Sequence, residues 1–230
     1  MSDPQLTMLD SNRHAWSHGA VTRCSAFVAW LARASWKMRA LAAFVAGGLS
    51  GLAMAPFFFS PVLLLTLPVL VWLIDTSAAG GTDRKAAMRR AAISGWFFGF
   101  GYFLFGLFWI GEAFLVEADK FAWLLPFAVT LLPAGLALFF ATAAAAAQRV
   151  WTPGLARVVI LALALAVAEW LRGHVLTGLP WNVLGYALTW PLPLMQSASV
   201  LGIYTLTVLT VIAFAAPLVG LADAAGQARG

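Results

Sequence analysis

One stretch of this sequence, Ala40 to Ile74, reads ALAAFVAGGLSGLAMAPFFFSPVLLLTLPVLVWLI and holds 35 consecutive residues without Asp, Glu, Lys or Arg. A helix needs about 20 mostly apolar residues to cross a bilayer, so the stretch is too long for one crossing and suits two short ones. Pro56 and Pro61 lie near its middle, and proline suits a turn at the membrane edge because it fixes φ and lacks an N–H donor. We therefore predict two membrane helices, about 40–56 and 60–75, joined by a tight turn.

Four more apolar runs continue this pattern and predict spans at about 91–111, 121–148, 158–176 and 198–220. The sequence therefore predicts an all-α fold, a multi-pass integral membrane helical bundle of about six transmembrane helices. A single transmembrane domain would occupy residues 39–222. It would lie between a tail of residues 1–38 and a short tail of residues 223–230.

Composition supports this class of protein. The chain is 62% hydrophobic and 10% charged, whereas soluble domains are about 45–50% apolar and about 25% charged. A disordered chain would need low hydrophobicity and high charge. The one cysteine excludes a disulfide framework and a cysteine-based zinc cluster.

The basic residues predict the orientation, because cytoplasmic loops retain Lys and Arg. With both termini in the cytoplasm, two basic residues, Lys120 and Arg172, lie outside. Twelve lie inside: Arg13, Arg23, Arg33, Lys37, Arg39, Arg84, Lys85, Arg89, Arg90, Arg149, Arg157 and Arg229. The net charge of +5 is then explained by topology, and no nucleic-acid partner is expected.

The tail of residues 1–38 is not a signal peptide, since its apolar patch is short and is cut by Arg33. Two interpretations stay open. Five residues, Phe27, Trp30, Leu31, Ala34 and Met38, would share a helical face, which suits an amphipathic helix on the inner leaflet. The alternative is a poorly ordered tail.

Small and aromatic residues give two weaker patterns. Glycines spaced four residues apart, at 47 and 51 and at 95 and 99, allow helices to approach closely, and we expect them to serve packing. Nine aromatic residues fall between Trp96 and Trp109. They would either line a lipid groove or face the bilayer.

Glu169 is the sharpest single residue, because a carboxylate at membrane depth is costly and usually faces the protein interior with a partner. Arg172 follows three residues later on the same helical face and could pair with it. One interpretation is a structural ion pair near the outer interface. The other is a polar anchor that orients a lipid headgroup.

The segment after Arg172 is uncharged and interrupted by helix-breaking residues, Gly178, Pro180 and Gly185. Irregular backbone at membrane depth is tolerated only where it is buried in protein or lines a cavity. A loop that merely caps two spans is the alternative to a binding site here. The candidates for binding substrate or lipid are Glu169, Arg172, Thr177, Pro180, Trp181, Asn182 and Tyr186.

No catalytic residue is predicted in this chain, and neither a metal site nor a cofactor is expected. The sequence has no glycine-rich phosphate loop, no His-Glu-x-x-His motif and no Ser-His-Asp set. Cys24, on the predicted cytoplasmic side, is poorly placed to be an external nucleophile.

Three stretches together resemble one family, the N-terminal membrane portion of bacterial apolipoprotein N-acyltransferases. The first is LAMAPF, residues 52–57; the second is GWFFGFGYFLFGLFWI, residues 95–110. The third and most specific is EWLRGHVLTGLPWNVLGY, residues 169–186. The resemblance covers about residues 40–220, and residues 1–38 show none.

The resemblance implies an enzyme of the bacterial inner membrane that completes lipoprotein maturation. In that family an acyl chain passes from a phospholipid to a cysteine as a thioester, and then to the α-amino group of a diacylglyceryl-cysteine lipoprotein. The family's Glu-Lys-Cys triad lies in a periplasmic nitrilase-like domain, for which this chain has no counterpart. The chain is then expected to be a truncated or split product, inactive alone, that supplies a lipid and substrate cavity.

Two other functions compete with this one. A small transporter would place polar residues along the spans at the midplane and often shows an internal repeat, whereas membrane-proximal polarity here gathers at one external rim. A non-enzymatic membrane scaffold for a separate partner is the second.

Overall fold

The computed structural model describes residues 22–79, 81–175, 177–189 and 192–227. The described residues form an all-helical protein without β-strands, as predicted. Six long helices carry the fold: α2 (Trp36–Ser50), α3 (Leu63–Asp75), α4 (Arg84–Gly106), α6 (Leu125–Arg149), α7 (Ala156–His174) and α9 (Ile203–Gln227). Two shorter ones are α5 (Ala118–Phe121) and α8 (Leu192–Leu201). The 3₁₀ segments are η1 (Gly51–Ala53), η2 (Ser60–Val62), η3 (Thr76–Ala78), η4 (Phe108–Phe114), η5 (Ala122–Leu124) and η6 (Leu184–Leu188).

Among the described residues, three helical segments are long and apolar enough to cross a membrane: Ser60–Ala78, Ala118–Arg149 and Ile203–Gly226. A bent pair, Arg84–Gly106 with Phe108–Phe114, would make a fourth. The predicted number of about six is therefore not confirmed. α2 has only 15 residues, and α7 carries three charged residues, Arg157, Glu169 and Arg172.

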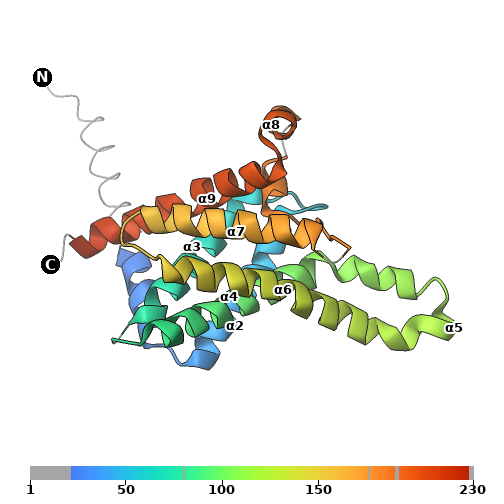
Figure 1. Ribbon diagram of the computed structural model, residues 1–230, viewed down its shortest axis with the longest axis horizontal. Coiled ribbons are helices and arrows are strands. Elements are labelled where there is room, and N and C mark those ends of the chain that lie inside the picture. The colour runs from blue at the N-terminus through green and yellow to red at the C-terminus, as the bar shows by residue number, and fades with distance from the viewer. Residues whose placement is uncertain (1–21, 80, 176, 190–191, 228–230) are drawn as a thin grey trace, which may run out of the picture.

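The long helices form a ring in which each packs most extensively against two neighbours. Around the ring the order is α2, α4, α6, α7, α9, α3 and again α2. Figure 1 shows α6, α7 and α9 lying side by side along the molecule, and the segment around α5 projecting beyond them. The chain reverses between η1 and η2, where the sequence predicts a turn at Pro56 and Pro61.

Glycines make the closest helix contacts of the ring. A Cβ atom on Gly47 of α2 would collide with the Phe98 carbonyl of α4, and one on Gly101 of α4 would collide with the Phe44 carbonyl of α2. A Cβ atom on Gly95 would lie 2.6 Å from the Phe140 carbonyl of α6. The small-residue patterns therefore serve packing, as predicted, since only glycine lets these backbones approach so closely.

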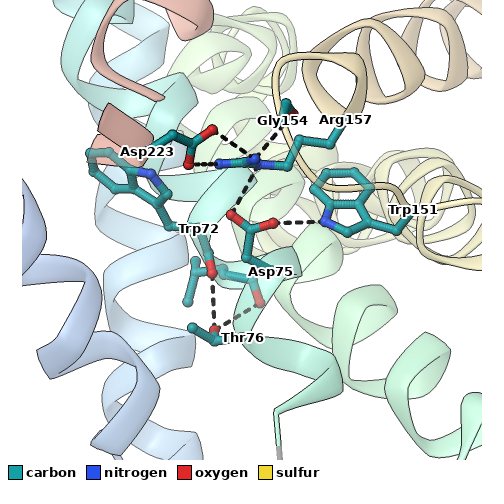
Figure 2. Close-up of polar contacts among 8 residues, drawn as sticks. Trp72, Asp75, Thr76, Trp151, Gly154, Arg157 and Asp223 are labelled. Atoms are coloured by element: carbon teal, nitrogen blue, oxygen red, sulfur yellow. Dashed lines mark hydrogen bonds and ion pairs between the residues drawn. The ribbon is translucent and has the colours of Figure 1, made fainter. Parts of the chain in front are cut away.

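One end of the ring is fastened by a charged cluster, shown in Figure 2. The guanidinium of Arg157, at the start of α7, donates to both carboxylate oxygens of Asp223 at 3.0 and 2.6 Å. Its Nε lies 3.2 Å from Asp75, which also accepts a 2.7 Å hydrogen bond from the Trp151 indole. Three helices, α3, α7 and α9, are thus tied together at one end of the ring.

The predicted amphipathic tail helix is interrupted in the structure. Of the tail of residues 1–38, residues 1–21 lie outside the described residues. A helix over 22–33 stops before Ser35, whose hydroxyl caps α2 by accepting from the Met38 N–H. Met38 therefore belongs to α2, and Phe27 and Leu31 do not continue into one face with it. Leu31 is fully buried against the core.

The aromatic third segment also differs from the predicted span over 91–111. α4 begins earlier, at Arg84, because Asp83 caps it by accepting from the Lys85 N–H. It ends at Gly106, and the chain continues in η4 at an angle of 51°. The bend at Leu107 carries Trp109 away from the axis of α4.

A bulky residue at Gly101 should weaken the fold because it would force α2 and α4 apart. We expect Gly101→Leu to lower the free energy of unfolding by about 1–3 kcal/mol, the usual cost of overpacking. The measurement is the thermal unfolding midpoint in detergent. Gly135→Leu is the matched control, because a Cβ atom there meets nothing within 4 Å. Equal midpoints for the two variants would contradict a glycine-dependent seam.

Candidate functional site

An apolar groove of about 800 Å³ opens between α2 and the bend that follows α4. One wall is the second half of α2, with Val45, Gly48 and Leu49. The opposite wall is formed by Phe105, Phe108 and Trp109, and the turn at Pro56 and Phe57 closes one end. The aromatic run therefore divides: these three rings line a groove, whereas Phe98, Tyr102 and Phe103 are buried in the core.

The loop between α7 and η6 meets this groove through two contacts. The rings of Trp109 and Trp181 lie 4.9 Å apart between centroids. The Asn182 side-chain amide lies so close to Gly106, a groove residue, that a Cβ atom there would collide with its Nδ2. Asn182 has a positive φ of 50°, which asparagine tolerates better than most residues, and its buried Nδ2 has no hydrogen-bond partner among the described residues.

Arg172 holds the carbonyl groups of this loop. Its guanidinium donates to the carbonyls of Leu179 and Trp181, the latter at 2.6 Å, and to that of Asn182 at 3.4 Å. It also lies over the Phe103 ring, 5.0 Å from the centroid. One buried cation thus satisfies three carbonyls that would otherwise be costly at this depth.

Glu169 holds N–H groups of the same region. Its carboxylate accepts from the Leu184 N–H at 2.8 Å and from the Thr207 hydroxyl at 2.6 Å. Thr207 in turn accepts from the Gly185 N–H at 3.0 Å. The side chain of Glu169 is fully buried, and both of its oxygens are occupied within the protein.

Glu169 and Arg172 do not form the ion pair that their spacing suggests. Ion pairs in the described part of the chain join Lys120 to Glu117 and Arg157 to Asp75 and Asp223. Glu169 and Arg172 instead divide the backbone of the loop between them, the acid taking donors and the base taking acceptors.

Comparison with known proteins identifies the family to which this arrangement belongs. A family model described as "Apolipoprotein N-acyltransferase N-terminal domain" matches residues 46–216. The chain belongs to this family.

Several curated apolipoprotein N-acyltransferases are similar to the chain. That of Rhodopseudomonas palustris is 58% identical over 184 residues, which cover 80% of this chain and 34% of the relative. That of Bradyrhizobium diazoefficiens is 57% identical over 182 residues, 79% of this chain and 33% of the relative. That of Sinorhizobium medicae is 51% identical over 181 residues, with shares of 78% and 34%. The chain thus spans about a third of the length of these curated relatives.

The structure separates the seven candidate residues of the acyltransferase-like segment into two groups. Glu169 and Arg172 are buried and hold the loop from behind. Trp181 and Tyr186 are exposed, and Asn182 is half-buried beside the groove. The Tyr186 hydroxyl donates to the Pro180 carbonyl at 3.4 Å. Thr177 is exposed on the loop, apart from these contacts.

Sequence reasoning missed three contributors to the site. Thr207 lies 38 residues beyond Glu169. The one sequence feature that could have pointed to it is a hydroxyl within an apolar run. Trp109 is predicted only as part of an aromatic series, without its partner Trp181. The α2 wall carries no polar residue that could have marked it as part of a groove.

The remaining reactive groups lie away from the loop. Cys24, the one cysteine of the chain, is half-buried on the helix over 22–33, and burial raises the pKa of its thiol. A raised pKa disfavours the nucleophilic thiolate. No group of three His, Cys, Asp or Glu side chains suited to a metal ion occurs in the described ranges.

Lysine in place of Arg172 should loosen the loop although the charge is kept. An ammonium group cannot donate to all three carbonyls as the planar guanidinium does. We therefore expect the folded loop to lose about 1.5–3 kcal/mol of stability, typical of a hydrogen bond to a charged group. The measurement is hydrogen exchange of residues 177–189, which should quicken in Arg172→Lys. The control is Arg149→Lys, at an exposed arginine. Unchanged exchange in Arg172→Lys would show that the guanidinium does not hold the loop.

Proposed function

We propose that this chain forms the membrane portion of a bacterial apolipoprotein N-acyltransferase and provides the groove that receives an acyl chain of the phospholipid donor. The observation that carries the proposal is the apolar groove beside the Trp181 loop, in a chain that matches the family's N-terminal domain model. A transporter would be expected to place polar groups along its midplane, whereas the polar groups here gather at the ends of the helices.

The proposed topology has six spans, with both termini in the cytoplasm of a bacterial inner-membrane protein. Its support is the ring itself, since successive long helices run in alternate directions. The start of α2, the end of α3 and the start of α4 meet at one end, where Arg39 donates to the Leu73 carbonyl and Arg84 to the Arg149 carbonyl. This end holds most of the basic residues and would face the cytoplasm. On this view residues 39–222 form the membrane domain.

The groove would hold the donor's acyl chain and the loop would meet its polar portion. Trp181 would lie at the interface, where indole rings are favoured. Asn182, whose buried amide lies against Gly106, would hold the loop against the groove wall. Pro180, Thr177 and Tyr186 would shape the rim, with Glu169 and Arg172 as positioning residues behind it.

The bond chemistry would come from residues outside this chain. In the proposed reaction the donor's acyl chain passes to a cysteine, forming a thioester and releasing lysophospholipid. The α-amino group of a diacylglyceryl-cysteine apolipoprotein then takes the acyl group, and the thiol is released. A nitrilase-like domain with a Glu-Lys-Cys triad would supply that cysteine, and this chain would contribute orientation. No cofactor enters this scheme.

Reporter fusions test the topology. Alkaline phosphatase, which is active only outside the cytoplasm, should be inactive when fused after residue 82 or residue 230. It should be active after Val116, the 84%-exposed residue before α5. A fluorescent protein that matures only in the cytoplasm should give the opposite pattern and serves as the control. Phosphatase activity at residue 230 would contradict cytoplasmic termini.

Acyl transfer tests the role of the groove. The chain alone should form neither a thioester nor an N-acylated product from phospholipid and apolipoprotein. Fused to the remaining part of the Rhodopseudomonas palustris relative, it should do both. In that fusion Leu49→Trp should lower the rate about tenfold, as a loss of about 1.4 kcal/mol of acyl-chain binding would, because the indole fills the groove from an exposed position.

Leu163→Trp is the matched control for that experiment, since Leu163 is similarly exposed on α7 and lies outside the groove. Its rate should stay near that of the parent fusion. Turnover by the chain alone, or equal rates for the two tryptophan variants, would overturn the proposal.

A further inference from the structure

A second cavity, of about 440 Å³, lies at the opposite end of the ring from the groove and is lined by three arginines. Arg39 comes from the first turn of α2, and Arg89 and Arg90 come from the second turn of α4. No acidic residue lines this cavity. The three cations therefore converge without a counter-ion from the lining.

The hydrogen bonds of Arg39 and Arg90 go to neutral groups. Arg39 donates to the Leu73 carbonyl at 2.8 Å and to the Thr76 carbonyl at 3.3 Å, and Arg90 donates to the Thr82 hydroxyl at 2.9 Å. None of the three takes part in an ion pair within the described residues. Burial, and after it the nearby positive charge of Arg90, lower the pKa of Arg39, and an anion between the two arginines would relieve their repulsion.

The rim of the cavity shows what kind of anion fits. Trp36 and Ile93 line it and are 68% and 44% exposed, so an apolar edge adjoins the basic floor. A tryptophan beside basic residues is typical of the membrane interface. Basic pockets between helices on the cytoplasmic side bind anionic headgroups, and guanidinium groups bind phosphate in a forked geometry.

We propose that Arg39, Arg89 and Arg90 form a binding site for the phosphate of an anionic phospholipid, separate from the acyl-chain groove. The site does not depend on acyltransferase activity, but it uses the same orientation of the ring in the membrane. Arg39 braces the end of α3 as well, so Arg89 and Arg90, both exposed, are the residues to change.

The test is a titration of the detergent-solubilised, delipidated chain with short-chain phosphatidylglycerol, followed by native mass spectrometry, with phosphatidylcholine in parallel. Phosphatidylglycerol should bind more tightly. The double variant Arg89→Gln with Arg90→Gln should weaken its binding about 10- to 30-fold, as loss of two basic contacts predicts. Arg89→Lys with Arg90→Lys should retain most of the binding and shows that the fold is intact.

The matched control removes the same charge elsewhere. Lys37 and Lys85 are exposed on the same helices and do not line the cavity. Their double glutamine variant should change binding less than about threefold, as expected for peripheral surface charge. Equal losses for the two glutamine pairs, or equal binding of the two lipids, would refute the site. Displacement of phosphatidylglycerol by inorganic phosphate at matched concentration would overturn the lipid assignment in favour of a soluble anion.

Discussion

The loop that follows α7 depends on one constraint: backbone polar groups buried away from water must find partners inside the protein. Glu169 and Arg172, on adjacent turns of one helix, meet that constraint together. The arginine donates hydrogen bonds to the carbonyls of residues 179, 181 and 182, and the carboxylate accepts one from the N–H of Leu184. Both charged groups are hydrogen-bonded to the loop or to Thr207, and they do not form an ion pair with each other. Losing either one would leave several buried polar groups unpaired, which is costlier than losing one ion pair at a surface.

That fixed loop also determines where the groove opens. With residues 179–182 held against α7, Trp181 reaches the ring of Trp109 and the amide of Asn182 lies against Gly106. α4 ends at that glycine and the chain bends into η4. The bend turns Phe108 and Trp109 toward α2, and the space between them becomes the apolar groove. The buried charged residues thus contact the loop, and the loop contacts the residues that line the groove.

The sequence predicts the class of fold because periodic constraints are local. Apolar runs, glycine spacing and the turn between Pro56 and Pro61 each leave a mark within a few residues, and the all-helical architecture follows from them. The contact of Asn182 with Gly106, beside the bend at Leu107, leaves none, since the two residues are far apart along the chain. The same holds for the Glu169–Thr207 contact, which joins residues 38 positions apart. Charge spacing within α7 suggests an ion pair, whereas both side chains bind the loop that follows, because a nearby backbone competes with the neighbouring side chain.

The two ends of the ring are stabilised by different kinds of contact. At one end Arg157, Asp75 and Asp223 link three helices through side chains that bind each other, so this end is closed by direct cross-links. At the other end one side-chain hydrogen bond, from Thr207 to Glu169, links α9 to α7, and the other contacts of Glu169 and Arg172 are to loop backbone. Between the two ends the glycine seam of α2 and α4 fixes one wall of the groove. In the proposed function, the rigid wall would keep an acyl chain oriented, while the loop, held only from behind, would adjust to a headgroup.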